Sequence, residues 1–337
     1  MQDSLDTLAT ADAIAAPTGG PVSLYLELAK FRLSGMVLLT TAVGFVLAPH
    51  SGAGPLVFLW ALLGTALSAA GANTLNQLLE TERDRRMVRT ALRPLPSGRI
   101  TPRGALAVGL ASAAAGVVVL ALGTNLLTAA LSVLVTVLYV GVYTPMKVRS
   151  PLNTVVGAVC GAIPPVMGWT AAAGTIGYGA MVLAGILFLW QIPHFLALAW
   201  LHRDDYRRGG FRMLPAVDPS GDLTGRIALV HTFALLPIGV GAWASGFAGP
   251  YFLGGSLALG LAFVLFGWGL ARRRSLSSAR RLFFVSLVYL PLLLGLMVAD
   301  RGRPVAAPGV VAVAPAATAA VPVASHATSR PISPNPV

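Results

Sequence analysis

Asn76, Glu80 and Asp84 are spaced four residues apart, so on a continuous helix their side chains lie along one face. All three carry oxygen atoms, and Mg²⁺ is commonly held by one or two carboxylates together with the phosphates of a substrate. Arg89 and Arg93 repeat the spacing if the helix continues that far, and arginine binds phosphate oxygens in a bidentate manner. The segment predicts a site that binds a magnesium ion and a polyanion together.

A simpler interpretation is that this basic segment only fixes the orientation of a membrane protein. Such a signal needs no carboxylates, so the ordered set of acids and arginines favours a binding site. Asn76 alone could instead join two helices by a hydrogen bond worth roughly 1 kcal/mol.

A second group of polar residues lies in the stretch WQIPHFLALAWLHRDDYRRGGFRML, residues 190–214. His194 follows a proline inside an apolar run, and Asp204 and Asp205 stand where that run ends. A histidine inside a membrane is a candidate for function, although it could also hydrogen-bond a carbonyl that a helix kink has freed. His231, inside another apolar run, is a further candidate, and His202 lies near the boundary and is ambiguous.

The elements that position these residues are predicted to be membrane helices. Of the 337 residues, 55% are hydrophobic and 11% are charged, with a mean hydropathy of +0.75. A helix needs roughly 20 apolar residues to cross a bilayer, and the Gly, Ala and Leu content favours helices over barrel strands. Nine runs qualify, at about 29–48, 54–79, 104–122, 125–144, 153–172, 178–200, 225–246, 252–271 and 281–299. Pro164 and Pro165 are expected to kink or break the fifth run.

The distribution of Lys and Arg predicts the orientation. They gather in alternate connections, at 80–103, 147–149, 201–226 and 272–281, and the opposite connections carry none. The positive-inside rule then gives a cytoplasmic N-terminus and an external C-terminus. The net charge of +12 mostly reflects this topology and contact with anionic headgroups, so we infer no nucleic-acid role.

The rest of the chain adds few functional candidates. We expect an N-terminal cytoplasmic segment at 1–24, a nine-helix membrane domain at 25–300 and a disordered Ala/Pro-rich tail at 301–337. The first 20 residues have no Lys or Arg, which fits neither a signal peptide nor a transit peptide, and a bacterial inner membrane is the expected location. The one cysteine, Cys160, allows neither an internal disulfide nor a cysteine metal site.

Three segments carry a resemblance to a known family: NQLLETERDRRMVRTALRPLPSGRI, YTPMKVRSPLNTVVGAVCGAIPPVMGW and FLWQIPHFLALAWLHRDDYRRGGFRMLP. With them the chain resembles the UbiA-type intramembrane prenyltransferases, and within these the branch of protoheme IX farnesyltransferases, or heme O synthases, over roughly residues 25–300. The resemblance implies nine helices around a central cavity. It also implies a magnesium-dependent transfer of a farnesyl group from farnesyl diphosphate to the 2-vinyl group of heme b, which gives a hydroxyethylfarnesyl side chain and diphosphate.

The resemblance also implies roles for individual residues. Asn76, Glu80 and Asp84 match the first acidic motif, with Glu80 where the superfamily often has aspartate. In the second motif Asp205 matches the later acid, and Leu201 occupies the earlier position. The magnesium ligands are therefore expected to be Asn76, Glu80, Asp84 and Asp205, and it stays open whether Asp204, Asp205 or His202 completes the second motif.

The remaining roles concern the two substrates. Lys147 and Arg149 match a basic pair that would join Arg89 and Arg93 in binding the diphosphate. His194 is the candidate for heme contact. A heme A synthase or the assembly of a terminal oxidase would follow downstream.

Two alternatives stay open. A UbiA-type enzyme could use another aromatic or chlorin acceptor, because cavity shape sets acceptor and tail length and the sequence does not display it. A secondary transporter would also suit nine spans with intramembrane His and Asn, but transport sites usually lie near the bilayer midplane, whereas these acids lie at one face beside a basic cluster.

Overall fold

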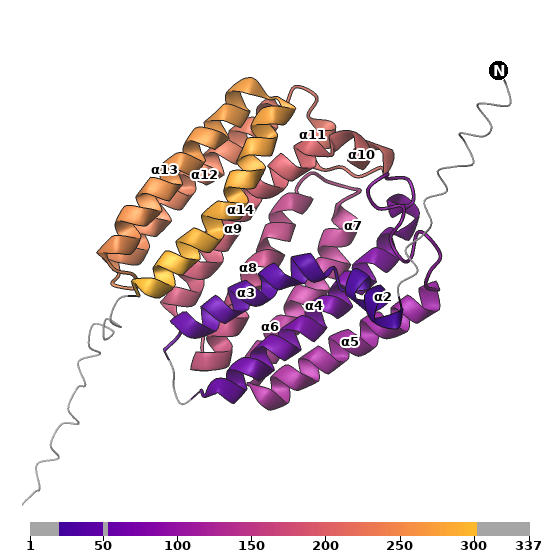
Figure 1. Cartoon of the computed structure of the whole chain (residues 1–337), viewed down its shortest axis with the longest axis horizontal. Coiled ribbons are helices and arrows are strands. Elements are labelled where there is room, and N and C mark those ends of the chain that lie inside the picture. Colours follow the sequence, from indigo (N-terminus) through magenta and orange to yellow (C-terminus); the bar gives the residue numbers. More distant parts are fainter. Residues whose placement is uncertain (1–19, 50–52, 302–337) are drawn as a thin grey trace, which may run out of the picture. The chain divides into compact units, whose positions relative to one another are not determined.

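The computed structural model describes residues 20–49 and 53–301, and within these ranges every regular element is a helix (Figure 1). The predicted tail, apart from Arg301, and most of the predicted N-terminal segment lie outside the described residues. The elements are α2 (Pro21–Leu28), α3 (Phe31–Leu47), α4 (Pro55–Asp84), α5 (Pro102–Gly123), α6 (Leu126–Val137), the π-helix η1 (Leu138–Tyr143), α7 (Thr144–Met146), α8 (Asn153–Ala173), α9 (Tyr178–Leu201), α10 (Arg203–Arg208), α11 (Leu214–Val217), α12 (Asp222–Ala244), α13 (Pro250–Arg273) and α14 (Leu276–Ala299).

Eight helical segments of the described chain are long and apolar enough to cross a membrane, which confirms the predicted all-helical membrane architecture. They are α4, α5, the continuous run Leu126–Met146, α8, α9, α12, α13 and α14. The first predicted span corresponds to α3, which has 17 residues and follows α2 after a bend of 69°. If this bent pair is counted as one span, the structure has the nine predicted spans.

Helix α8 occupies the centre of the bundle and contacts α3, α4, α6 and α9. A side chain on Gly44 of α3 would come within 2.0 Å of the Pro165 carbonyl oxygen, and one on Gly168 within 1.8 Å of the Thr41 carbonyl oxygen. Glycines at these two places therefore let the backbones of α3 and α8 touch. The sequence predicted a kink or a break at Pro164 and Pro165, and the helix runs through both without a break; close packing of neighbouring helices tolerates the missing backbone donors.

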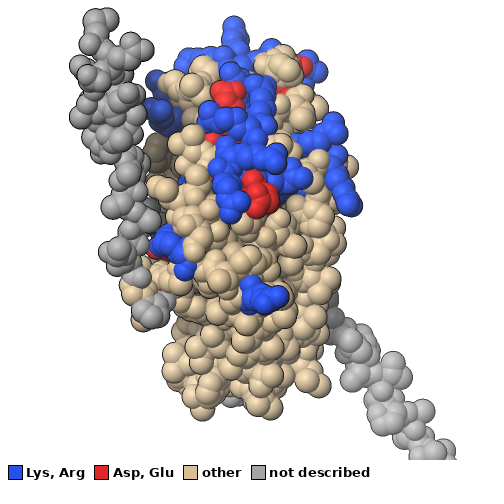
Figure 2. All heavy atoms as spheres, turned by 90° about the vertical axis from the view of Figure 1, so that its right-hand side faces the viewer, with Lys and Arg blue, Asp and Glu red and all other residues tan. Residues whose placement is uncertain are grey.

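Two connections meet at the end of the bundle where Lys and Arg gather (Figure 2). Helix α4 ends at Asp84, and residues 85–101 form a series of turns. Met87 in these turns packs in one apolar cluster with Phe211 and Met213 from the segment after α10. The turns after α4 are thus held against the segment that follows α9.

Candidate active site

The three polar residues of α4 lie on its buried face, as their spacing predicts. Asn76 is 0% exposed, Glu80 4% and Asp84 1%. Burying two carboxylates requires partners of opposite charge, because an unpaired charge in a low-dielectric interior is costly. The basic side chains that contact Asn76, Glu80 and Asp84 come from three other segments of the chain.

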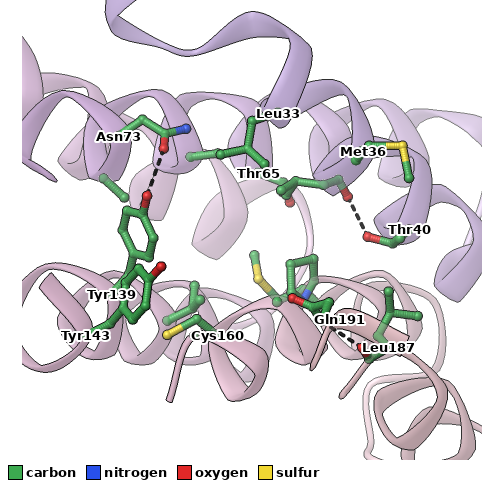
Figure 3. A pocket seen from close by; sticks show the side chains of 18 of the residues that line it. Leu33, Met36, Thr40, Thr65, Asn73, Tyr139, Tyr143, Cys160, Leu187 and Gln191 are labelled. Atoms are coloured by element: carbon green, nitrogen blue, oxygen red, sulfur yellow. Dashed lines mark hydrogen bonds between the residues drawn. The ribbon is translucent and has the colours of Figure 1, made fainter. Parts of the chain in front are cut away.

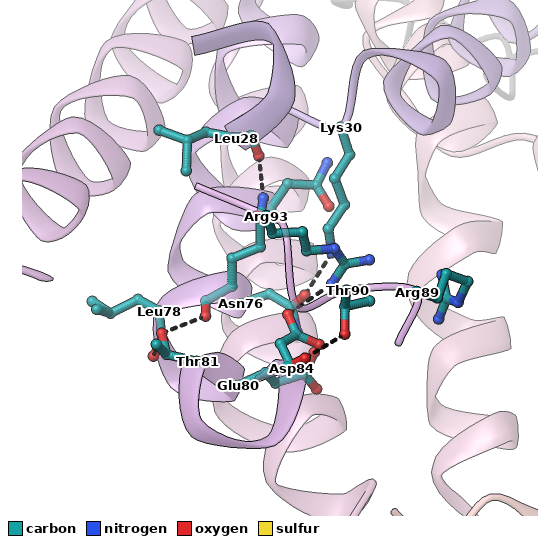
Figure 4. A network of polar contacts seen from close by, with 12 residues as sticks. Leu28, Lys30, Asn76, Leu78, Glu80, Thr81, Asp84, Arg89, Thr90 and Arg93 are labelled. Atoms are coloured by element: carbon teal, nitrogen blue, oxygen red, sulfur yellow. Dashed lines mark hydrogen bonds and ion pairs between the residues drawn. The ribbon is translucent and has the colours of Figure 1, made fainter. Parts of the chain in front are cut away.

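Each of the three residues contacts one basic side chain, and Figure 4 shows Lys30 near Asn76 and Arg93 near Asp84. Lys147 Nζ lies 2.8 Å from Glu80 Oε1, and Arg93 Nη1 lies 2.7 Å from Asp84 Oδ2. Burial lowers the pKa of Lys147, but the Glu80 carboxylate, together with the nearby Tyr143 and Tyr139, outweighs this and raises it well above its ordinary value. Lys147 is therefore positively charged beside the Glu80 carboxylate.

The third basic side chain, Lys30, was not predicted from the sequence as a site residue. Its ammonium donates to Asn76 Oδ1 at 2.7 Å, while the Asn76 amide donates to Thr144 Oγ1 at 2.9 Å. Lys30 has a φ of 49°, which L side chains rarely adopt, at the bend between α2 and α3. The feature of the sequence that could have indicated it is the position of this lysine at the start of an apolar run.

These residues fit a magnesium ion. Asp84 Oδ1 is buried and has no hydrogen-bond partner in the described structure, so a carboxylate oxygen is available for a ligand. No three His, Cys, Asp or Glu residues of the described chain stand close enough together to hold a metal. Glu80 and Asp84 would therefore supply the carboxylates that hold the ion, with phosphate oxygens and waters completing its coordination, the arrangement that Mg²⁺ commonly adopts. The oxygen of Asn76, the third predicted ligand on α4, accepts a hydrogen bond from Lys30.

The second acidic motif has a different environment. The Asp204 side chain is 73% exposed and pairs with Arg207 of its own helix. Asp205 accepts hydrogen bonds from the backbone N–H groups of Val88, at 3.0 Å, and Arg89, at 3.4 Å. In this structure Asp205 therefore contacts the turns after α4 rather than joining Glu80 and Asp84 in one group of acids.

The pKa of Asp205 reflects these contacts. Burial raises it, but the hydrogen bonds from Arg208 and from the Val88 and Arg89 amides together bring it below the ordinary value. The neighbouring His202 is half-buried, and burial followed by the charge of Arg89 lowers its pKa.

Two of the four predicted diphosphate-binding cations lie at the surface. The sequence predicted that Arg89 and Arg93 would lie on the same face as Asp84 if the helix continued that far. Helix α4 ends at Asp84, so they do not continue this face. Arg93 folds back to Asp84, whereas Arg89 is exposed, points away from that cluster and lies 5.9 Å above the ring of Tyr206 (Figure 4). Lys147 is part of the cluster, and Arg149 is exposed.

An apolar cavity of about 280 Å³ lies between α3 and α4 on one side and η1, α8 and α9 on the other (Figure 3), and residues of α14 complete its lining. Its size is close to the lower end of ligand pockets, roughly 300 Å³. Its few polar side chains include Asn73, Tyr139, Tyr143, Gln191 and His194.

Two tyrosines of η1 connect this cavity with the charged cluster. Tyr139 donates to Asn73 Oδ1 at 3.3 Å and stacks on Tyr143, with 5.4 Å between ring centroids. The Tyr143 ring in turn faces Lys147 Nζ at 4.7 Å. Irregular π-turns inside helices frequently occur at functional sites. The sequence did not single out these tyrosines.

His194 lines the cavity, as a functional histidine should. Its ring stacks between Trp190 and Phe283, each with a centroid separation of 4.9 Å. Its Nδ1 lies 2.7 Å from Ser286 Oγ. His231, in contrast, bonds the Ile227 carbonyl of its own helix at 2.8 Å and does not line this cavity.

The comparisons with known proteins agree on the fold and the chemistry. The sequence profile of the UbiA prenyltransferase family matches residues 37–288. A protoheme IX farnesyltransferase of Solibacter usitatus is 43% identical over 286 residues, which cover 82% of this chain and 98% of the relative.

Two solved structures share the fold. One is a digeranylgeranylglyceryl phosphate synthase, with a TM-score of 0.71 at 15% identity over 83% of this chain and 98% of the other. Another is a UbiA homologue from Archaeoglobus fulgidus bound to GPP and Mg²⁺, with a TM-score of 0.56 at 16% identity over 81% of this chain and 99% of the other.

Proposed function

Since this chain belongs to the UbiA prenyltransferase family, we propose that it transfers a farnesyl group from farnesyl diphosphate to the 2-vinyl group of heme b. The bond between farnesyl C1 and the diphosphate oxygen breaks, and C1 bonds to the terminal vinyl carbon. Water adds to the inner vinyl carbon and loses a proton, which gives the hydroxyethylfarnesyl side chain. The relative at 43% identity supports this donor and acceptor by its name.

The observation that carries the proposal is the cluster of paired charges at the polar end of α4, next to an apolar cavity. Lys147 and Arg93 are ion-paired with the two carboxylates, and Lys30 donates a hydrogen bond to Asn76 beside them. Placed against a diphosphate, they stabilise the negative charge that develops on the leaving oxygen. Magnesium, held by Glu80 and Asp84, would neutralise further charge on the phosphate oxygens.

The cavity supplies the second requirement, a place from which water is largely excluded. The farnesyl tail is apolar, and the walls formed by α3, α8 and α9 are mostly apolar. A cationic allylic carbon survives until it meets the vinyl group only where water is scarce. Tyr143 stands between the charged cluster and the cavity, where C1 of the donor would lie.

His194 is proposed to contact the heme. Ser286 Oγ donates to the Phe283 carbonyl at 2.5 Å, so the hydroxyl proton is already used. With its hydroxyl donating to Phe283, Ser286 Oγ accepts from Nδ1 in the Nδ1–H tautomer of His194, and in this tautomer Nε2 has a lone pair. A ring held between Trp190 and Phe283 with a free Nε2 is suited to bind iron.

The spectrum of bound heme tests this role. We expect His194→Ala to change the absorption spectrum of heme b added to the purified protein, while Leu292→Ala, which alters an exposed side chain of α14 outside the cavity lining, should leave it unchanged. An identical spectrum for His194→Ala and the wild type would remove His194 as an iron ligand.

The reaction itself is tested with the purified chain, heme b, farnesyl diphosphate and magnesium. The product should exceed heme b by the mass of one farnesyl group and one hydroxyl group, with diphosphate released in equal amount. Asp84→Ala should abolish it, while Glu82→Gln serves as the control because this carboxylate is 72% exposed on the same helix. Full product from Asp84→Ala would contradict the catalytic site.

The two other functions predict different outcomes. A UbiA-type enzyme with another acceptor would release diphosphate with an aromatic or chlorin acceptor but not with heme b. A secondary transporter would move a substrate into proteoliposomes and release no diphosphate.

The location of the chain is also part of the proposal. We place it in a bacterial inner membrane with the basic end of the bundle, and so the N-terminus, on the cytoplasmic side. The product would then pass to a heme A synthase or to the assembly of a terminal oxidase.

A further inference from the structure

A groove of about 450 Å³ lies between the end of α13 and the start of α14, apart from the cavity described above. The two helices run side by side (Figure 1). The groove is lined by Phe266 of α13 and by the first turns of α14, including Arg280 and Arg281. Neither arginine contributes to the charged cluster at Glu80 and Asp84.

Arg280 and Arg281 form no ion pair with any described residue. The reason lies in the sequence, since residues 250–299 contain no Asp or Glu. Arg274 in the turn between the two helices does find an acid, Asp222 of α12, at 2.6 Å. The groove therefore presents two guanidinium groups whose positive charge the protein leaves uncompensated.

The walls beside these arginines are apolar and open to the surroundings. Phe284 is 58% exposed and Leu276 54%, and Phe266 and Val285 complete the apolar lining. Both helices are membrane spans, so the groove lies where a span meets the polar boundary of the bilayer. Its ligand must combine negative charge at one end with an apolar body.

We propose that this groove binds an anionic glycerophospholipid, with the phosphate between Arg280 and Arg281 and an acyl chain along Phe266 and Phe284. Basic pockets between membrane helices bind such headgroups, and an arginine fork matches the oxygens of a phosphate. A soluble phosphate would use the two arginines but would leave the apolar walls exposed. A zwitterionic lipid would bring its own cation against two positive groups.

The groove also borders the residues that shape the cavity. Phe284 packs edge-on against Phe283, with ring centroids 5.6 Å apart. Phe283 stacks on His194, and Ser286, three residues further along α14, contacts the His194 ring nitrogen Nδ1. A lipid in the groove would contact the outer surface of the same helical turn whose inner surface holds His194.

Native mass spectrometry tests the proposal on the full chain in detergent, with palmitoyl-oleoyl phosphatidylglycerol and phosphatidylcholine added in equal amounts. The wild type should retain phosphatidylglycerol in preference. The double variant Arg280→Gln/Arg281→Gln should weaken its binding roughly tenfold and leave phosphatidylcholine binding unchanged, because two charges next to the headgroup are lost.

The matched control is Arg272→Gln/Arg273→Gln. These arginines are exposed at the same end of the bundle, have no ion pair in the described chain and do not line the groove. The control should bind phosphatidylglycerol within about twofold of the wild type. Phe284→Ala should weaken binding of the lipid, and sn-glycerol 3-phosphate at the same concentration should not displace it.

Four outcomes would overturn the proposal. Equal losses in the two double variants would show general charge attraction, and equal binding of both lipids by the wild type would show no headgroup recognition. Displacement by sn-glycerol 3-phosphate would identify a site for soluble anions. A wild-type dimer that dissociates in Arg280→Gln/Arg281→Gln would assign the groove to a second copy of the chain. Size-exclusion profiles and melting temperatures of all variants distinguish these results from misfolding.

Discussion

The two acidic segments look alike in sequence and differ in structure. Glu80 and Asp84 end one long span, Asp204 and Asp205 follow another, and arginines stand beside both pairs. Glu80 and Asp84 are buried and ion-paired with cations from other segments, and Asp84 keeps one oxygen free. Asp204 is exposed, and Asp205 holds the turns that follow α4. The two segments therefore differ in burial and in the origin of their ion-pair partners, and not in residue type.

The largest expected effect comes from Asp84→Asn, which removes a charge without changing size. We expect kcat/KM for farnesyl transfer to fall by about 10³-fold, similar to the loss of a strong electrostatic contact in a transition state. Removing divalent ions with EDTA should abolish turnover in the wild type, and added Mg²⁺ should restore it. An Asp84→Asn enzyme with wild-type kinetics would place Asp84 outside the site.

Lys147→Met should mainly lower stability. It leaves the Glu80 carboxylate buried without its ion-pair partner, which should lower the free energy of unfolding by about 3 kcal/mol. In the double variant Lys147→Met/Glu80→Gln no charge is left unpaired, so the melting temperature should recover while farnesyl transfer stays low. If the melting temperature of the double variant is as low as that of Lys147→Met, the loss of the Lys147–Glu80 ion pair does not explain the lower stability.

The sequence predicted one of these two environments well. A spacing of four residues is a local property of a helix, so Asn76, Glu80 and Asp84 were correctly expected on one face. The partners depend on tertiary packing. Lys30 approaches Asn76 across 46 residues of sequence and Lys147 approaches Glu80 across 67, which no short-range pattern encodes.

Contacts between segments far apart in sequence also explain where the sequence-based predictions were wrong. The spacing of Arg89 and Arg93 fits a helix, but α4 ends at Asp84, and the turns that follow are held by Asp205 and by packing against Phe211. The break expected at Pro164 and Pro165 is absent because α3 packs tightly against α8. Both features result from contacts between distant segments. The membrane spans, in contrast, follow from composition alone, and their predicted boundaries lie close to the observed helix ends.

Asp205→Asn tests the supporting role and should have an intermediate effect. Losing the charge weakens the hydrogen bonds to the Val88 and Arg89 amides, so the turns that carry Arg93 become less well positioned. We expect KM for farnesyl diphosphate to rise about tenfold with a smaller change in kcat, and the free energy of unfolding to fall by about 1–2 kcal/mol. A loss of kcat as large as that of Asp84→Asn would instead place Asp205 among the catalytic residues.

The pH dependence of the same variant gives an independent check. The folded protein holds the pKa of Asp205 below its ordinary value, so the proton binds more weakly in the folded state than in the unfolded one. Its contribution is therefore fully present above the unfolded pKa of about 4 and is lost as the pH falls through the lower folded value. The difference in melting temperature between wild type and Asp205→Asn should shrink below about pH 4. A constant difference down to pH 3 would show that the carboxylate charge is not what stabilises the turns.

Asp204→Asn should have the smallest effect, although the sequence places Asp204 next to Asp205. Its side chain is 73% exposed and pairs with Arg207 three residues away, and such surface pairs contribute roughly 0.5 kcal/mol or less. We expect farnesyl transfer within about twofold of the wild type and an unchanged requirement for magnesium. Because Asp204 and Asp205 share one helical turn, comparing their variants separates the effect of burial from that of position. If Asp204→Asn raised the magnesium concentration needed for half-maximal activity, bound substrate would have to draw Asp204 into the site, and the contrast between the two acidic segments would hold only for the chain without its ligands.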